Sequence, residues 1–99
     1  MKVLSVVETA IYVDDLDAAE DFYQRVLGLS VIAKKPNHHV FFQVGDSNVL
    51  LAFNPTMTRA EEETPHGATG PGHFAFGIEK QSLDDWRKHL VAHGVVIEA

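Results

Sequence analysis

The feature that most constrains this sequence is an internal repeat. When the second half of the chain is shifted back by 65 residues, His73 falls on Glu8. With one further residue of offset, Gly94 falls on Gly28. Both halves therefore have the same order, which is a strand, a helix, a glycine and another strand. A chain with this repeat is expected to fold as two related modules.

The first half predicts one strand, one helix and three further strands. Residues 3–13 are rich in Val and Ile and alternate in polarity, which is typical of a strand. Asp14 and Asp15 offer an N-cap to a helix whose apolar positions recur three and four residues apart. The predicted helix covers 16–27, and the later strands cover 29–34, 39–44 and 48–53.

The second half repeats only part of this order. After a loop rich in Pro and Gly, it predicts a strand at 73–78, a helix with an apolar stripe from Leu83 to Val91, and another strand at 95–97. We therefore expect an α+β fold of paired βαβββ modules. We expect the second module to be truncated, or to be completed by another chain. The predicted divisions are a first module at 1–54, a linker loop at 55–72 and an incomplete β-α-β module at 73–99.

The composition argues against several classes of function. The formal charge is −6, whereas nucleic-acid binding depends on an excess of Lys and Arg. No apolar run reaches the roughly 20 residues that cross a bilayer, and the N-terminus does not resemble a secretory signal. With 0 Cys there is no thiolate ligand or cysteine nucleophile. We expect a cytoplasmic domain that binds neither nucleic acid nor membrane. We also expect a homodimer, because a domain of this size buries limited surface alone.

Three segments of the chain resemble one known family. They are ETAIYVDDLDAAEDFYQRVLGL at 8–29, HVFFQVGD at 39–46 and GPGHFAFGI at 70–78. They resemble the vicinal-oxygen-chelate superfamily, which includes glyoxalase I, extradiol ring-cleaving dioxygenases, fosfomycin-resistance transferases and bleomycin-resistance proteins. The resemblance implies paired βαβββ modules that form a cupped sheet around a divalent metal. It extends over essentially the whole chain, but this chain matches only part of the family's usual two-module domain.

Glu8 and His73 are the predicted metal ligands. They occupy equivalent positions of the repeat, so a pseudo-twofold axis would turn both side chains into one cavity. Strand alternation supports this placement. The strand faces opposite Glu8 and His73, which carry Ile11 and Phe76, would then pack against the helices. The resemblance implies the same two ligands. It puts the family's fourth-strand ligand position on Leu50, which cannot bind a metal, and its last-strand ligand position after residue 99. This donor set suits Fe, Mn, Zn or Ni. The alternative is a solvent-facing Glu8 and a structural His73.

The third predicted strand supplies the substrate pocket. His39, Phe41 and Gln43 share one face, and the more apolar alternate set is expected to meet a helix. His39 is the candidate catalytic acid or base, and Tyr12 is expected at the pocket rim. The alternative is a half-buried strand with a polar outer face, against which Tyr12 packs.

The remaining histidines and acids support weaker predictions. His89 and His93 lie four residues apart on the second helix, a spacing that can hold a metal, but they lack a general base between them. We expect them on a solvated face. His66 is expected in a mobile loop rather than in a lid over the pocket, and His38 in a turn. Glu61–Glu63 is expected to be a solvated run of charge.

Two functions from different classes remain open. The first is a metal-dependent enzyme, dioxygenase-like or lyase-like, that binds a small-molecule substrate through two neighbouring oxygens on a divalent metal. The second is a metal-free protein of the bleomycin-resistance type that sequesters an aromatic drug. Dependence of ligand binding on metal and on Glu8 separates them. A third possibility is that the chain functions only when a partner completes it.

Overall fold

The computed structural model describes residues 1–98, which divide into two compact units. Unit 1 is Met1–Thr69, and unit 2 begins at Gly70. The boundary lies inside the segment predicted as a linker, residues 55–72. The predicted assignment of these parts to two modules of one domain remains a prediction.

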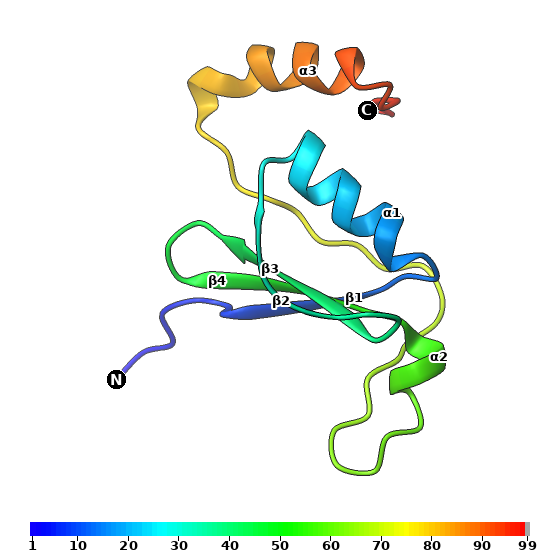
Figure 1. Cartoon of the computed structure of the whole chain (residues 1–99). Helices are drawn as coiled ribbons and strands as arrows, with labels where there is room; N and C mark the ends of the chain where they lie inside the picture. Colours follow the sequence, from blue (N-terminus) through cyan, green and yellow to red (C-terminus); the bar gives the residue numbers. More distant parts are fainter. Residues whose placement is uncertain (99) are drawn as a thin grey trace. The chain divides into compact units, whose positions relative to one another are not determined.

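Unit 1 is built on a mixed four-stranded sheet (Figure 1). Three strands pair antiparallel in the order β4-β3-β2, whereas β1 adds to β4 in parallel. The bounds are β1 (Glu8–Tyr12), β2 (Ser30–Lys35), β3 (His39–Val44) and β4 (Asn48–Phe53). The predicted α+β class and the βαβββ order of the first half are confirmed.

The first strand is shorter than predicted. The sequence predicts a strand over 3–13, but β1 spans only Glu8–Tyr12. Its ends are set by β4, because the Val49 N–H donates to the Val7 carbonyl and the Val13 N–H donates to the Phe53 carbonyl, both at 2.9 Å. Upstream of Val7 the apolar residues are exposed and lie outside the sheet. The strand-like pattern of residues 3–13 is therefore longer than β4, the strand with which it pairs.

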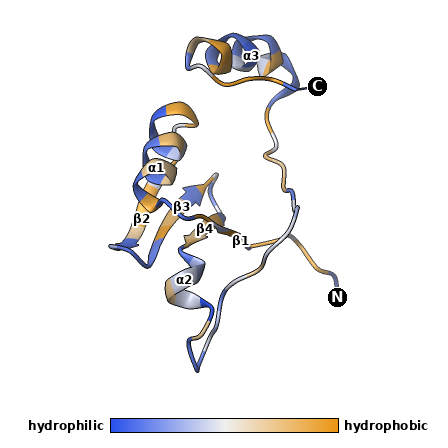
Figure 2. Cartoon of the chain, turned by 90° about the vertical axis from the view of Figure 1, so that its right-hand side faces the viewer, coloured by the Kyte–Doolittle hydropathy of each residue, from blue (hydrophilic) through white to orange (hydrophobic). Residues whose placement is uncertain are grey.

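One helix packs against the sheet of unit 1 and contains an unusual turn. The α1 helix (Leu16–Asp21) starts at Asp15, whose side chain accepts a 2.9 Å hydrogen bond from the Ala18 N–H. It continues as a π-helical turn, η1 (Phe22–Val26), in place of the uniform α-helix predicted over 16–27. Hydrophobic and hydrophilic residues alternate along this helix, as expected for an element with one buried face (Figure 2).

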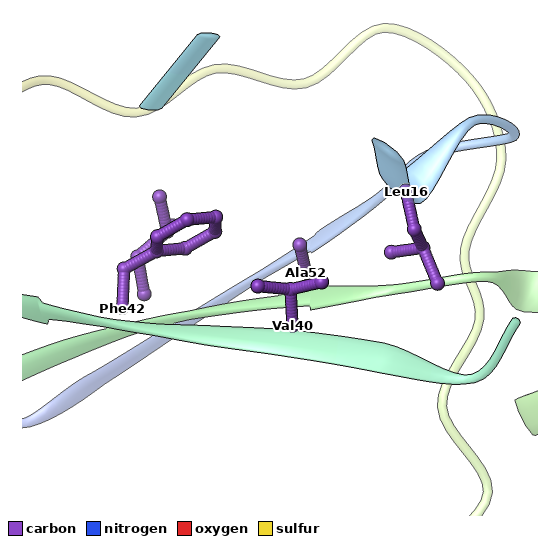
Figure 3. Packing of buried hydrophobic residues seen from close by; sticks show 5 residues of the cluster. Leu16, Val40, Phe42 and Ala52 are labelled. Atoms are coloured by element: carbon purple, nitrogen blue, oxygen red, sulfur yellow. The ribbon is translucent and has the colours of Figure 1, made fainter. Parts of the chain in front are cut away.

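The core of unit 1 lies between α1 and one face of the sheet. Figure 3 shows Phe42, Val40 and Ala52 rising from β3 and β4 toward Leu16 of α1. Phe42 and Ala52 are completely buried, and Leu50 joins the same cluster. This set is entirely aliphatic or aromatic, so its burial supplies the hydrophobic stabilisation of the unit.

Unit 2 contains helices but no strand among its described residues. A 3-10 turn, η2 (Lys80–Ser82), leads into α3 (Leu83–Ala92), which confirms the predicted helix. The strands predicted at 73–78 and 95–97 are not formed in the described chain, so those two predictions are wrong for this structure. Alternation gives a segment two faces, but a strand also needs a hydrogen-bonded neighbour. Within residues 1–98, every helix is too short or too polar to traverse a lipid bilayer.

Candidate functional site

The second face of the sheet in unit 1 carries the candidate site. Because strand side chains alternate, every residue next to a core residue points to the opposite side. We call this side the cleft face. Its members are Glu8, Ala10 and Tyr12 of β1, His39, Phe41 and Gln43 of β3, and Val49, Leu51 and Phe53 of β4.

The register arranges these side chains in three rows across β3, β4 and β1. One end row is Gln43, Val49 and Glu8; the middle row is Phe41, Leu51 and Ala10; the other end row is His39, Phe53 and Tyr12. Four residues separate the end rows along each strand, which is about 13 Å at roughly 3.3 Å per residue. One end of the cleft face is therefore polar, the middle is apolar, and the other end is aromatic.

A cleft of about 550 Å³ lies over this face. Its floor is Phe41, Leu51, Phe53 and Val49, joined by Ile32 from β2 at the point where the β2–β3 register shifts. Its polar groups come from both ends of the sheet and from the segment after β4; they are Glu8, His38, His39, Glu61, Thr64 and His66. An apolar floor with a few polar groups around it is typical of a small-molecule site.

Aromatic rings line one end of the cleft. The His39 ring stacks on Phe41 with ring centres 4.2 Å apart, and the His66 ring stacks on Phe53 at the same distance. Phe41 and Phe53 meet edge to face at 5.5 Å, and Tyr12 stacks beyond Phe53 at 6.3 Å. Such ring pairs hold one another in defined orientations, so this end offers flat apolar surfaces edged by imidazole nitrogens.

The segment after β4 is anchored on the cleft by one buried threonine. Thr58, the last residue of α2 (Pro55–Thr58), is fully buried. Its hydroxyl lies 2.6 Å from the His66 carbonyl and 3.2 Å from the Asn54 carbonyl, and its own carbonyl accepts the His66 N–H at 3.0 Å. This double link fixes His66 above Phe53. His66 therefore lies over the cleft, and its expected mobility remains a prediction.

Three titratable groups meet at the aromatic end. The Nδ1 atoms of His38 and His39 lie 2.7 Å apart, and Nε2 of His38 is hydrogen-bonded to Oε1 of Glu61. Burial lowers the pKa of His39; the positive charges of His38 and Lys35 lower it further, and Glu61 acts in the opposite direction. His39 is therefore held toward its neutral form, as a proton acceptor must be.

The structure brings all the predicted unit 1 site residues onto one face. Glu8, His39 and Phe41 line the cleft. Tyr12 lies on the same face at its aromatic end, and the Gln43 side chain donates a 2.9 Å hydrogen bond to the Gly45 carbonyl. The catalytic and binding roles assigned to these residues remain predictions.

The predicted metal ligands lie in different units. The Glu8 side chain is exposed on the cleft face and has no hydrogen bond or ion pair with the described residues. His73 belongs to unit 2, so its pairing with Glu8 remains a prediction. No three His, Asp or Glu side chains in residues 1–98 form a group able to hold a metal. The resemblance puts a further ligand position on Leu50, but Leu50 points into the core, so that position falls on the wrong face of β4. Its neighbours on the cleft face, Val49 and Leu51, also lack donors.

Sequence reasoning missed three titratable residues of the cleft. His38 was expected only in a turn and Glu61 in a solvated run, but both line the cleft and contact each other. His66 joins them through the Thr58 link. A weak signal exists for His38, since it directly precedes a strand that carries His39 on the pocket face. Nothing local in the sequence connects Glu61 to it, because the contact spans 23 residues.

Several solved structures have a fold similar to that of this chain. A lactoylglutathione lyase from Agrobacterium tumefaciens is 38% identical, with a TM-score of 0.89 over 99% of this chain and 76% of that one. The fosfomycin resistance protein FosX from Listeria monocytogenes shares the fold at 18% identity, with a TM-score of 0.70 over 99% of this chain and 71% of that one. No curated protein matches the sequence significantly.

The family model points the same way. The model of the Glyoxalase/Bleomycin resistance protein/Dioxygenase superfamily matches residues 5–99, which is nearly the whole chain. A further solved member, a glyoxalase/bleomycin resistance protein/dioxygenase from Alicyclobacillus acidocaldarius, is 23% identical, with a TM-score of 0.62 over 91% of this chain and 64% of that one. The chain belongs to the Glyoxalase/Bleomycin resistance protein/Dioxygenase superfamily.

Proposed function

We propose that this protein is a metal-dependent enzyme of the superfamily that acts on a small molecule bound in the cleft of unit 1. The observation that carries the proposal is the free carboxylate of Glu8. It borders a largely apolar cleft, and no described residue forms a hydrogen bond or ion pair with it. A carboxylate that has no partner and borders an apolar cleft is suited to bind a ligand or a cation.

The donors available in the chain suit a divalent metal. Glu8 offers a carboxylate and His73 offers an imidazole, which is a set that Fe, Mn, Zn and Ni all accept. Strand β4 adds no donor, since its cleft-face residues are Val49, Leu51 and Phe53. We propose that Glu8 and His73 would hold the metal. When bound, such a metal polarises substrate oxygens as a Lewis acid.

The three rows indicate how a substrate would lie. Its oxygens would meet the polar row at Glu8, and an apolar or aromatic part would rest on Phe41 and Phe53. A substrate that reaches both Glu8 and His39 must span about 13 Å along the strands and about 10 Å across them, because β4 lies between β1 and β3. The aromatic floor covers one side of that part, and His39 accepts or returns a proton there.

The reaction type is proposed from the similarity of sequence and fold. The lactoylglutathione lyase at 38% identity supports a lyase-like reaction over a dioxygenase-like one. FosX and the Alicyclobacillus protein support the fold only. The proposal includes a cytoplasmic location and a homodimer. The exposed apolar side chains of Phe74, Phe76 and Ile78 support contact with a second copy.

Metal binding tests this function directly. Purified protein would be equilibrated with Mn²⁺, Fe²⁺, Zn²⁺ or Ni²⁺ and its metal content measured, alongside Glu8→Gln and His73→Ala. Glu62→Gln and His93→Ala are matched controls, because they remove the same groups elsewhere on the surface. We expect about one metal per chain in the wild type and in both controls, and loss of at least tenfold in affinity in the two site variants.

Two outcomes would contradict the metal site. One is a wild type that binds none of the four metals at millimolar concentration. The other is metal that is retained by both Glu8→Gln and His73→Ala. Circular dichroism on each variant separates a lost ligand from a lost fold.

A second function is favoured by the aromatic end of the cleft. Four rings, those of His39, Phe41, Phe53 and His66, form stacked and edge-to-face pairs around it, which suits a flat ligand held without chemistry. Titration calorimetry with bleomycin as the probe distinguishes this case. Binding that survives chelator and Glu8→Gln but falls in Phe41→Leu would support a metal-free binding protein. Absence of bleomycin binding removes its support.

A further inference from the structure

A chain of three side chains links solvent to the aromatic end of the cleft. Glu61, whose side chain is 40% exposed, bonds to Nε2 of His38, whose side chain is only 17% exposed. Nδ1 of His38 then meets Nδ1 of His39 at 2.7 Å, and the His39 ring lies against Phe41 in the cleft. Neighbours in sequence would ordinarily turn away from each other in a strand, so this contact depends on His38 lying just before β3.

The backbone around His38 holds it in this place. Asn37 adopts a left-handed conformation, with φ of 63°, at the turn between β2 and β3. The His38 N–H donates to the Lys35 carbonyl and the His38 carbonyl accepts the Asn54 N–H, both at 3.0 Å. The imidazole of His38 therefore projects from a backbone that is fixed on both sides.

Counting protons assigns a donor and an acceptor to each contact. An ionised carboxylate only accepts, so Nε2 of His38 must carry the proton in its bond to Glu61. When His38 is neutral, its Nδ1 has no proton and accepts from Nδ1–H of His39. His39 is then left with its lone pair on Nε2. The tautomer of His39 is thus set by the carboxylate of Glu61, which is connected to it through two hydrogen bonds by way of His38.

We propose that Glu61 and His38 are positioning residues that hold His39 in its Nδ1–H tautomer, with Nε2 as the basic atom offered to a substrate. The second part rests on the proposed function, since it needs a substrate in the cleft. The tautomer itself does not depend on substrate or metal.

The same contacts form a short proton relay. A substrate acid gives its proton to Nε2 of His39 and keeps the electron pair as its conjugate base. The Nδ1–H bond of His39 breaks as an N–H bond forms at Nδ1 of His38. His39 ends neutral with its proton on Nε2, and the positive charge rests on His38 beside the Glu61 carboxylate, where it is best stabilised. Reversal of the same steps returns the proton.

Electrostatics around His39 agree with the role of a base. Four titratable groups surround it: Lys35 on β2, His38 before β3, and Glu61 and His66 on the segment after α2. Burial is the main reason that the pKa of His39 is lowered, and the charges of His38 and Lys35 act the same way. Glu61 opposes them. A relay that moves the charge to His38 takes it away from the partly buried ring of His39.

Nitrogen NMR on the intact chain tests the proposal. Two-bond ¹H–¹⁵N correlations would assign the tautomers of His38 and His39 in the wild type, in Glu61→Gln, and in the control Glu62→Gln, which neutralises the adjacent acid. At pH 8 we expect His39 to be Nδ1–H and His38 to be Nε2–H in the wild type and control. In Glu61→Gln we expect His39 to give a mixture of tautomers.

Two results would overturn the proposal. They are a wild-type His39 that is protonated on Nε2 at pH 8, and a Glu61→Gln variant with the wild-type tautomers. The relay makes a second prediction for the same spectra. The nitrogen signals of His38 and His39 should change together as one proton is added, and signals that change independently contradict the relay. Because this measurement uses no metal, it stands or falls separately from the metal analysis of Glu8 and His73.

Discussion

The two faces of one sheet in unit 1 have opposite properties although they are built from alternating residues of the same strands. On the core face Val40, Phe42 and Ala52 are at most 1% exposed and lie under α1. On the cleft face their neighbours His39 and Phe41 are only partly buried and border an open volume of about 550 Å³. The alternation of strands thus separates a buried core face from an open cleft face within a single segment, HVFF.

The largest expected difference comes from truncating one phenylalanine on each face. Phe42→Ala removes a fully buried ring and should cost about 3–5 kcal/mol in the free energy of unfolding. Phe41→Ala should cost about 1 kcal/mol, because its site already opens to solvent and no closed cavity forms. Urea unfolding followed by circular dichroism measures both.

Phe42→Leu provides a milder variant if Phe42→Ala does not fold. An equal loss in the free energy of unfolding for Phe41→Ala and Phe42→Ala would contradict the difference between the two faces. It would mean that the rings of the cleft contribute to stability as much as the core does.

The next largest effect tests how the cleft face is held by the segment after β4. Thr58→Val keeps the shape of a fully buried side chain but removes the hydroxyl that bonds the His66 and Asn54 carbonyls. We expect a loss of about 1–3 kcal/mol, because the part-buried His66 carbonyl is left without its hydroxyl donor. We also expect the ring signals of Phe53 to shift as His66 moves.

Thr56→Val is the matched control, since Thr56 is exposed on the same short helix. A control that loses as much stability as Thr58→Val would assign the effect to helix propensity. Unchanged Phe53 signals in Thr58→Val would show that His66 stays in place without this link.

The smallest expected effect is a different pH response of the two faces. The pKa of His39 is lowered, so below about 6.5 the unfolded chain takes up this proton first, and stability falls as pH decreases. The pKa of Tyr23, on the core side, is raised by burial. Above about 10 the unfolded chain loses this proton first, and stability falls as pH increases.

Thermal melts of three proteins across pH separate these contributions. His39→Gln should reduce the loss below pH 6.5 and leave the alkaline side unchanged. Tyr23→Phe should do the reverse. A single variant that flattens both sides would show that the faces are not independent.

Local signals explain the parts of the fold that the sequence predicts well. The strand ends of the first half coincide with turn residues such as Asn37 and Gly45, and both take positive φ angles in the structure. Strand alternation placed Glu8, His39 and Phe41 on one face for the same reason, since a period of two is a property of the backbone. These predictions needed no knowledge of distant contacts.

The remaining features depend on contacts that no local pattern records. Residues 73–78 alternate as clearly as β1 does, yet they form no strand in the described chain, because pairing is decided by a neighbour. The error at Leu50 has a simpler cause: a shift of one residue along a strand moves a side chain to the other face. Glu61 joined the site through a contact that spans 23 residues.

The parallel pairing of β1 with β4 has a consequence for the order in which this unit folds. Strands β2, β3 and β4 are linked by short turns, so they can pair as soon as each is made. β1 is made first, but it must wait for β4, because Glu8 pairs with Val49 and Tyr12 with Phe53. Closing that long loop is the slow entropic step. We therefore expect the carboxylate of Glu8 to reach the cleft together with Tyr12, after β3 and β4 have paired.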